Sequence, residues 1–398
     1  MSTAQFDYIV VGSGAGGGPL AARLARAGFK VLLLDRAAFG TDTLSTHLIH
    51  QPGIAALARW GLLDAVRASG CPPLDRTVYE VADIRLDGCA RGVDGQRAGY
   101  APRRHVLDAL LVEAAGAAGA EIRDGCRVTE LLRDRSGRVV GVSGGHESGA
   151  FTEHAHLVIG ADGMRSTVAR LAGAPYTVED PRLTCAYYTY WEDVPAVLEL
   201  HERPGSWVAA VATHDAATLV LAYFRQSRFD EVRTDAQGAY LEQIRTTAPA
   251  LYERLRDRQP LERLRGTGDQ QNFFRQAAGP GWALVGDAGH HKDSITARGI
   301  SDAFTQVEAL VRQVDGRLGG DPAVLDTALG AYARERDTAL TPGYEATLGV
   351  AQLTQHEQRL ALLRAVRKDP ELTSIYFDMV AGIESASALY TPKLLALL

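Results

Sequence analysis

Residues 7–28 read DYIVVGSGAGGGPLAARLARAG, and they decide the fold of the first part of the chain. The run DYIVV is apolar and rich in β-branched residues, which is typical of a strand buried on both faces. The glycines that follow lead into a helical spacing of leucines, with Pro19 in the first turn and Gly28 as a stop signal. Residues 30–35, KVLLLD, predict a second buried strand. The unit is therefore strand, glycine turn, helix and strand.

The glycine turn fits the pattern G-x-G-x-x-G of dinucleotide-binding proteins. Gly12 permits the tight turn, Gly14 lets the backbone approach a pyrophosphate, and Gly17 lets the helix pack close to the strand. Ala15 and Gly16 fill the variable positions, beside the N–H groups and the positive dipole of the helix N-terminus. We expect this turn to hold the phosphates of a dinucleotide.

An acidic residue at the end of the second strand completes this pattern. Asp35 lies 18 residues after Gly17, where a carboxylate can accept hydrogen bonds from ribose hydroxyls. Arg36 follows it, and its side chain either covers the adenine or is a solvated surface arginine. The unit predicts a bound dinucleotide but does not separate FAD from NAD.

The alternation of buried strands and helices continues later in the chain. Residues 157–163, LVIGADG, and 282–289, WALVGDAG, predict buried strands that end in polar turns. Residues 104–119 and 300–315 predict helices, and we expect a strand near residues 120–128. These segments predict an α/β domain around a parallel sheet.

Two other regions have different patterns. Residues 183–225 contain aromatic, strand-like runs separated by turns, which predicts an antiparallel sheet in a second lobe. From about residue 325 the chain predicts helices, broken near Pro342, Pro370 and Pro392.

Composition and charge restrict the function further. The chain has 398 residues, of which 48 are acidic and 42 basic, and the net charge of −6 argues against general nucleic-acid binding. Its apolar runs are too short for a membrane span, and its N-terminus lacks the basic residues of a signal peptide. The cysteines lie far apart with no CxxC, so we expect reduced thiols in a cytoplasmic protein and no zinc site. They are Cys71, Cys89, Cys126 and Cys185.

Two further motifs identify a family. The first, GADGMRSTVAR, covers residues 160–170, and the second, GDAGHHKDSITARGISDA, covers residues 286–303. Together with the N-terminal turn, and in this order, they resemble the three fingerprints of FAD-dependent monooxygenases of the para-hydroxybenzoate hydroxylase fold. This superfamily also includes flavin-dependent halogenases and geranylgeranyl reductases. The resemblance covers roughly residues 5–315.

The resemblance implies an α/β fold with a Rossmann-like FAD-binding domain, a second lobe built on an antiparallel β-sheet, and a helical C-terminus. The FAD-binding domain would be discontinuous, and a smaller substrate domain would be inserted into it. The expected parts are residues 1–75, 100–173 and 268–325 for FAD, 76–99 and 174–267 for substrate, and 326–398 for the C-terminal helical region.

The resemblance also implies roles in holding FAD. Asp287 would hydrogen-bond the ribose, and Gly299 and Ile300 would present backbone N–H groups to the flavin ring. Asp162 and Gly163 would shape the turn near the pyrophosphate and the approach path of the nicotinamide cofactor.

Three more residues of the FAD site follow from the resemblance. Thr46 lies in a segment that passes near the flavin in relatives, Arg104 begins a helix that contacts FAD, and Val128 lies beside the adenine. The complete expected site is Gly12, Gly14, Ala15, Gly16, Gly17, Asp35, Arg36, Thr46, Arg104, Val128, Asp162, Gly163, Asp287, Gly299 and Ile300.

The second motif departs from the family pattern. Ser294 stands where a proline is common, Ala297 stands at the first of two glycines, and Gln306 occupies a position where an aspartate is frequent. We expect a looser loop, with a Cβ near the flavin, that alters the approach of oxygen or substrate. His290 and His291 have no carboxylate or cysteine partner at metal spacing, so we expect capping and solvent contact and no metal site.

In this family NAD(P)H reduces FAD, oxygen adds to give a flavin hydroperoxide, and the distal oxygen passes to the substrate. Because the site must exclude water, we expect a pocket with apolar and aromatic walls beside the flavin. Alternation along the strands of the second lobe would turn about half of its aromatic residues toward the flavin, and the others would pack in the sheet core. These residues are Tyr187, Tyr188, Tyr190, Trp191, Trp207, Tyr223 and Phe224.

The sequence assigns no catalytic base. His47 and His50 follow the second strand and can serve as a proton donor or substrate anchor, although a structural role fits both. Tyr188 and Tyr190 are further candidates for catalysis, and each also fits a structural role.

We therefore expect a cytoplasmic FAD-dependent monooxygenase that hydroxylates a small, largely apolar or aromatic metabolite in a biosynthetic tailoring step. NADPH or NADH would be the reductant, supplied directly or through a separate flavin reductase, and oxygen the co-substrate. A flavin-dependent alkene reductase of the geranylgeranyl reductase type is an alternative. A halogenase is disfavoured because the segment WxWxIP, usual in those enzymes, is absent. A flavin-binding protein without turnover remains a further alternative.

Overall fold

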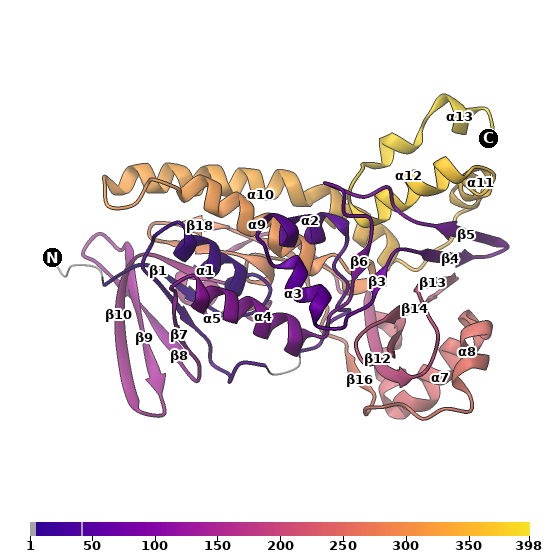
Figure 1. Cartoon of the computed structure of the whole chain (residues 1–398), viewed down its shortest axis with the longest axis horizontal. Coiled ribbons are helices and arrows are strands. Elements are labelled where there is room, and N and C mark those ends of the chain that lie inside the picture. The colour runs from indigo at the N-terminus through magenta and orange to yellow at the C-terminus, as the bar shows by residue number, and fades with distance from the viewer. Residues whose placement is uncertain (1–4, 41–42) are drawn as a thin grey trace.

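A computed structural model describes residues 5–40 and 43–398 (Figure 1). The predicted N-terminal unit forms as β1 (Phe6–Val11), α1 (Gly17–Arg26) and β2 (Val31–Leu34). β1 lies between β2 and β10 (Gly149–Gly160) and is parallel to both. This parallel, covered position explains why β1 and β2 are almost continuous apolar runs.

The sheet around β1 has eight strands, and both of its faces are buried. Tyr8 and Val10 pack on one face against α1, α4 (Arg104–Ala117) and α9 (Gly299–Val314). Ile9 and Val11 pack on the other face with α5 (Thr167–Ala172). The path runs β18 (Ala278–Gly279), β19 (Trp282–Leu284), β10, β1, β2 and β7 (Glu121–Arg123), and β9 (Val139–His146) joins β10 to β8 (Arg127–Arg133).

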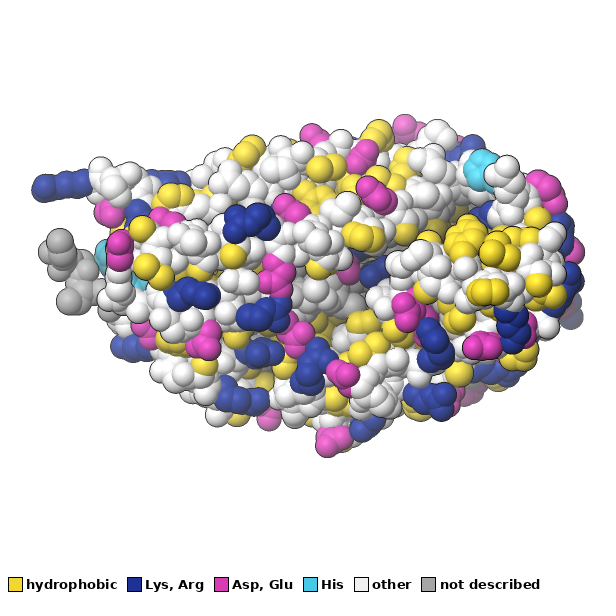
Figure 2. All heavy atoms as spheres, turned by 90° about the horizontal axis from the view of Figure 1, so that it is seen from above, with side chains coloured by type: hydrophobic (Ala, Val, Ile, Leu, Met, Phe, Trp, Pro, Cys, Tyr) yellow, Lys and Arg dark blue, Asp and Glu magenta, His cyan; other side chains and the backbone are white. Residues whose placement is uncertain are grey.

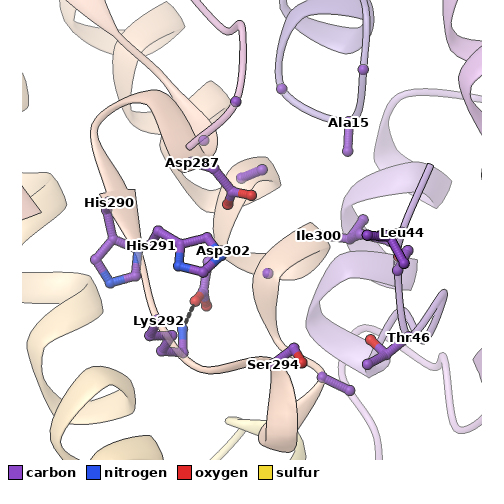
Figure 3. A pocket seen from close by; sticks show the side chains of 18 of the residues that line it. Ala15, Leu44, Thr46, Asp287, His290, His291, Lys292, Ser294, Ile300 and Asp302 are labelled. Carbon is purple, nitrogen blue, oxygen red and sulfur yellow. Dashed lines mark hydrogen bonds and ion pairs between the residues drawn. The ribbon is translucent and has the colours of Figure 1, made fainter. Parts of the chain in front are cut away.

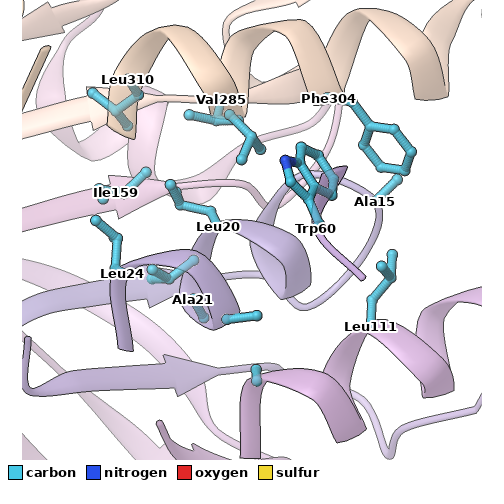
Figure 4. Packing of buried hydrophobic residues seen from close by; sticks show 14 of the residues in the cluster. Ala15, Leu20, Ala21, Leu24, Trp60, Leu111, Ile159, Val285, Phe304 and Leu310 are labelled. Carbon is cyan, nitrogen blue, oxygen red and sulfur yellow. The ribbon is translucent and has the colours of Figure 1, made fainter. Parts of the chain in front are cut away.

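The packing of α1 fixes the glycine turn at the carboxyl end of β1. Leu20 and Leu24 of α1 point into the cluster that Ile159 of β10 and Leu310 of α9 also enter (Figure 4). All four side chains are buried. Because α1 is held on both sides, its N-terminus stays at the sheet edge where ligands of doubly wound folds bind.

A second sheet of seven strands forms the predicted second lobe, and five of its six neighbouring strand pairs are antiparallel. The strands of residues 183–225 pair antiparallel as predicted, and one pair, β13 with β4, is parallel. The reason is that the strands from residues 77–88, far away in sequence, add to its edge. Its order is β16 (Arg265–Thr267), β12 (Thr184–Glu192), β15 (Ala217–Arg225), β14 (Ser206–Ala212), β13 (Leu198–Arg203), β4 (Thr77–Val81) and β5 (Ile84–Gly88).

The C-terminal part is helical as predicted, but Pro342 does not break it. Pro342 lies inside α10 (Pro322–Ala351), which runs along α9. Burial of Leu340, Gly343 and Tyr344 on either side outweighs the roughly 3 kcal/mol cost of a proline in a helix. Pro370 and Pro392 do mark boundaries, because each lies in the first turn of a helix. The helices after α10 are α11 (Glu357–Val366), α12 (Pro370–Ala381) and α13 (Pro392–Leu395).

The remaining elements include helices α7 (Ala236–Thr247) and α8 (Pro249–Leu255), which cover one face of the second sheet, and two small sheets. The small sheets are the pair β3 (Pro73–Leu74) and β6 (Gly99–Tyr100), and the sheet of β11 (Tyr176–Asp180), β17 (Asn272–Arg275) and β20 (His290–His291); the other helices are α2 (Gln51–Arg59), α3 (Leu63–Ala68) and α6 (Phe229–Val232). No helix in residues 5–40 and 43–398 is long and apolar enough to cross a membrane. Figure 2 shows acidic and basic side chains mixed over one face of the molecule, with apolar ones gathered near the C-terminal helices.

Candidate active site

Two cavities meet at the glycine turn. The nucleotide cavity, of about 470 Å³, is lined by Gly12, Asp35, Arg36, Val128 and Asp162 among others. The ring cavity, of about 200 Å³, lies on the other side of the turn (Figure 3). Its lining includes Ala15, Gly16, Thr46, Asp287, Gly299 and Ile300, while Gly14, Arg104 and Gly163 border both cavities.

The geometry of the turn explains its glycines. Gly12 has a φ of +100°, and a Cβ there would lie 2.6 Å from the carbonyl carbon of Ala161. A Cβ on Gly17 would lie 2.9 Å from the carbonyl carbon of Gly12, so the helix can approach β1 only without a side chain. Gly17 lines neither cavity, because it faces β1. Its role is the close packing that the sequence predicted.

The turn also presents free backbone donors. The N–H groups of Gly14, Ala15 and Gly16 have no hydrogen-bond partner among the described residues. They precede α1, whose N-terminus carries a positive partial charge. This cradle, between a cavity on the side of Asp35 and a cavity on the side of Asp287, fits the pyrophosphate of FAD.

Asp35 braces the turn as well as lining the nucleotide cavity. Its Oδ2 accepts hydrogen bonds from the backbone N–H of Ser13 at 2.8 Å and from the Ser13 hydroxyl at 2.6 Å. Its Oδ1 accepts one from the N–H of Ala37 at 3.0 Å. The carboxylate is thus fixed at the cavity wall, where remaining lone pairs can accept from a ribose.

Asp162 has a structural task that the sequence did not reveal. Its carboxylate accepts hydrogen bonds from the N–H groups of Thr167, at 2.6 Å, and Val168, at 3.2 Å, and from the hydroxyl of Ser166. Burial raises the pKa of Asp162, against the lowering effect of these bonds. The Asp162 side chain therefore caps the N-terminus of α5, and the residue also lines the nucleotide cavity.

Arg104 begins α4 and pairs with Asp108 one turn later. Its Nε and Nη2 donate to the two carboxylate oxygens at 3.0 and 2.8 Å. Both residues line the nucleotide cavity, and Arg104 extends to the ring cavity beside Gly14. The pairing holds a positive charge where the phosphates of a dinucleotide would lie.

A buried ion pair lies in the ring cavity, and the sequence reasoning missed it. Lys292 contacts Asp302 of α9, and Figure 3 shows the pair below Asp287. Burial, together with the charge of Arg298, lowers the pKa of Lys292 to about 7. The only sequence signal was a lysine within the second motif, in a chain with very few lysines.

The loop that departs from the family pattern is firmly held, so the expectation of a looser loop is wrong. The Ser294 N–H donates to Oε1 of Gln270 at 3.1 Å, and the N–H of Asp293 donates to Oδ1 of Asn272 at 2.7 Å. Ala297 has a φ of +53°, which explains why a glycine is usual there. Gln306 accepts a hydrogen bond from the N–H of Gly286 at 3.0 Å and so supports the turn that carries Asp287.

His290 and His291 pack against rings and backbone. The ring of His290 lies 4.4 Å from that of Phe274, and burial holds the pKa of His290 well below its ordinary value. Nδ1 of His291 contacts the carbonyl oxygen of Gln271. Within the described residues, no three His, Cys, Asp or Glu side chains are grouped as metal ligands.

A third cavity, the apolar cavity of about 280 Å³, adjoins the ring cavity. Thr46 and Ala297 border both. Its walls are Leu198, Trp207 and Leu221 of the second sheet, together with residues of α10, α11 and α12. It is a largely apolar space beside the place where the flavin ring would lie.

The aromatic residues of the second sheet divide between its faces as expected. Tyr187, Trp191 and Phe224 pack against α7 and α8. The others point to the opposite face, where Trp207 and Tyr223 line the apolar cavity. The Tyr223 hydroxyl lies 3.0 Å from Oγ of Ser294 and so links this cavity to the loop. Tyr188 and Tyr190 line none of the three cavities.

The two candidate histidines lie in different places. His47 is fully buried, its Nε2 contacts the hydroxyl of Tyr190, and neither residue lines any of the three cavities. His50 lines the apolar cavity, and its Nε2 lies 3.2 Å from the carbonyl oxygen of Thr296. Burial and the charge of Arg298 lower the pKa of His50 to about 4, so this imidazole is neutral near pH 7.

Comparison with known proteins agrees with this geometry. A family model described as FAD binding domain matches residues 5–340. The chain is 27% identical over 313 residues to digeranylgeranylglycerophospholipid reductase of Methanocella arvoryzae, covering 76% of this chain and 75% of that one. It is 26% identical to rifampicin monooxygenase of Streptomyces venezuelae, covering 89% of this chain and 72% of that one.

A solved structure shows the same fold. The myxobacterial chondrochloren halogenase CndH superimposes with a TM-score of 0.76 at 22% identity, covering 98% of this chain and 95% of that one. The chain therefore belongs to the FAD binding domain family and is an FAD-dependent oxidoreductase.

Proposed function

We propose that the protein is a monooxygenase that uses NADPH or NADH and oxygen to hydroxylate a small, largely apolar or aromatic metabolite. The observation that carries this proposal is the junction of the ring cavity with the apolar cavity at Thr46 and Ala297. A substrate held there would lie beside the flavin ring and away from bulk water. The monooxygenases among the relatives support the same activity.

The residues of the two joined cavities would hold FAD along their length. Asp35 would bind the adenosine ribose, the N–H groups of Gly14 to Gly16 would bind the phosphates, and Gly299 and Ile300 would face the flavin ring. When bound, FAD supplies the redox chemistry with NAD(P)H and oxygen.

The chain itself would position the substrate and exclude water. The sheet residues Trp207 and Leu221 form one wall, and Val350 of α10 and Phe377 of α12 close the other. Lys292 and Asp302 hold a charged pair in the ring cavity, where it can stabilise negative charge on a reduced ring. A separate flavin reductase is a second possible source of electrons.

Alkene reduction is the second candidate function, because digeranylgeranylglycerophospholipid reductases are among the relatives. The size of the apolar cavity argues against a lipid with two long chains. At about 280 Å³ it lies near the lower end of the range for drug-sized ligands, roughly 300–1,000 Å³. A small molecule suits it better.

The test is turnover of the FAD-loaded protein under isotopically labelled dioxygen, with NADPH or NADH and a panel of small aromatic compounds. Mass spectrometry of the products then shows the source of any new oxygen atom. A product that contains one labelled oxygen supports the monooxygenase. Products that gain two hydrogens, and form equally well without oxygen, would replace it with the reductase.

A further inference from the structure

Arg298 is a charged side chain on the wall of the apolar cavity, and the protein does not neutralise it. It lies between Ala297, which borders both the ring and the apolar cavity, and Gly299 at the start of α9. Its guanidinium makes no hydrogen bond or ion pair with another described residue, and its Nε atom is buried. Burial alone lowers the pKa of Arg298, with no carboxylate acting against it.

Two glycines provide the space for this guanidinium. A Cβ on Gly343 of α10 would lie 3.1 Å from its Nη1, and a Cβ on Gly382 would lie 3.0 Å from its Nε and closer to Nη2. Gly382 has a φ of +79° and caps the C-terminus of α12. The negative end of this helix faces the cation and makes its burial less costly. The guanidinium therefore has a defined place at the cavity wall.

The second arginine on the same wall is neutralised. Nη1 and Nη2 of Arg359 donate to the two carboxylate oxygens of Glu202 at 2.8 and 2.9 Å, and Nη2 also donates to the hydroxyl of Tyr79. Arg359 and Arg298 both line the apolar cavity. The cavity thus contains one balanced and one unbalanced guanidinium.

The groups around Arg298 do not supply the missing anion. His50 is neutral near pH 7, and the hydroxyls of Thr296 and Thr347 lie 2.8 Å from one another. All three line the apolar cavity and can donate or accept hydrogen bonds. Arg298 is partly buried, with its Nε fully buried, and an unpaired charge held out of water is costly unless a partner arrives; a ligand in the cavity can supply that partner.

We propose that the substrate of the apolar cavity carries a single carboxylate, which Arg298 binds through its guanidinium. One cation and neutral neighbours match one negative charge, and a planar fork of donors matches a carboxylate. A dianionic phosphate would keep one of its charges unbalanced in this space. The rest of the ligand would lie along the apolar walls at Trp207 and Leu221. The ligand is therefore a small aryl or alkyl carboxylic acid.

This inference deepens the proposed function, because it names the substrate class of the same site. Arg298 is next to Ala297, where the apolar and ring cavities meet. A carboxylate held there would fix which end of the substrate faces the flavin. Binding can be measured without turnover, so the two proposals can fail separately.

The experiment is calorimetric titration of the FAD-loaded protein with two matched pairs of probes. The pairs are naphthalene-2-carboxylate with naphthalene-2-carboxamide, and octanoate with octanamide. We expect each acid to bind about 30-fold or more tightly than its amide in the wild-type protein, the effect of a buried charge pair. In the Arg298→Met variant the two members of each pair should bind within about threefold of each other.

The control removes the balanced arginine together with its partner. The Glu202→Gln, Arg359→Met double variant keeps the cavity charge unchanged, and its preference for acids should persist. Thermal unfolding separates ligand binding from a structural role: Arg298→Met should unfold at the same temperature as wild type or higher, since it removes an unpaired buried charge.

The proposal is overturned if neither acid binds, if acids and amides bind equally to the wild type, or if the preference survives in Arg298→Met. Loss of several degrees of thermal stability in Arg298→Met would also overturn it, since it would show that the guanidinium serves the packing of α10 and α12. Acid binding without oxygen transfer would reject only the proposed monooxygenase.

Discussion

Substitution of Gly17 by alanine tests the link between the glycine turn and the fold. The added Cβ would lie 2.9 Å from the carbonyl carbon of Gly12 and closer still to its oxygen, and 3.3 Å from the Cβ of Ala161. Carbon atoms in contact prefer separations of about 3.5–4.0 Å, so α1 would have to move away from the sheet by roughly 0.6 Å or more. β1 cannot move away to relieve the contact, because it is hydrogen-bonded to β10 on one side and to β2 on the other.

The loss of unfolding free energy should be large, because neither the added Cβ nor the carbonyl group of Gly12 can move without moving its backbone. Overpacking of a well-packed interior costs about 1–3 kcal/mol, and we expect Gly17→Ala to lose about 3 kcal/mol of unfolding free energy. The displaced N-terminus of α1 should also weaken FAD binding by about tenfold or more, since the N–H groups that face the phosphates move with it. The loss of about 3 kcal/mol is a large part of the unfolding free energy of a typical protein, about 5–15 kcal/mol.

Urea unfolding followed by circular dichroism measures the first effect, and quenching of flavin fluorescence measures the second. Gly349→Ala is the matched control, because Gly349 is exposed on α10 with no heavy atom near its added Cβ. That control should gain up to about 1 kcal/mol. A Gly17→Ala protein whose unfolding free energy stays within about 1 kcal/mol of wild type, and which binds FAD normally, would show that the close approach of α1 to Gly12 is not required.

Three further substitutions test individual residues. Asp35→Ala should weaken FAD binding about tenfold or more, by fluorescence titration, because a charged acceptor is lost; unchanged affinity would contradict its place in the site. Burial and Arg298 lower the pKa of His50 to about 4 from 6.5, so unfolding takes up a proton as the pH falls from 6.5 to 4. Wild type should lose about 3 kcal/mol more stability across that window than His50→Asn, and parallel pH profiles of the two would exclude this. Ala297→Gly should gain up to about 1 kcal/mol by relieving its left-handed backbone, whereas Ala361→Gly in α11 should lose about 1 kcal/mol; a loss in both would show no strain at Ala297.

The sequence predicts the N-terminal unit of β1, glycine turn, α1 and β2 well, because the signals for each element lie within that element. Strand, glycine turn, helix and strand succeed one another within 35 residues, and each carries its own pattern. Apart from Gly17, the residues expected to hold FAD line two joined cavities, since most of them lie at turns after buried strands or at the starts of helices. Long-range pairing is harder to predict. The parallel contact of β4 with β13 joins segments more than 100 residues apart and leaves no local signal.

The details of the site depend on packing that no motif encodes. Pro342 predicts a helix break, but burial along α9 carries α10 through it. Ser294 predicts a loose loop, but Gln270 and Asn272 come from a distant strand region to hold it. Arg298 stands in the middle of a recognised motif, and only the structure shows that it has no partner on the cavity wall. A charge without a counterion is a property of three-dimensional surroundings.

The proposed monooxygenase activity is tested most directly by the reaction of the reduced enzyme with oxygen, followed by stopped-flow absorbance. The FAD-loaded protein is reduced without oxygen and mixed with oxygenated buffer in the presence of small aromatic acids and amides. A monooxygenase should give a transient spectrum that differs from both oxidised and reduced FAD, followed by a hydroxylated product. A direct return to oxidised FAD with every compound, together with oxygen-independent saturation of an alkene, would contradict it.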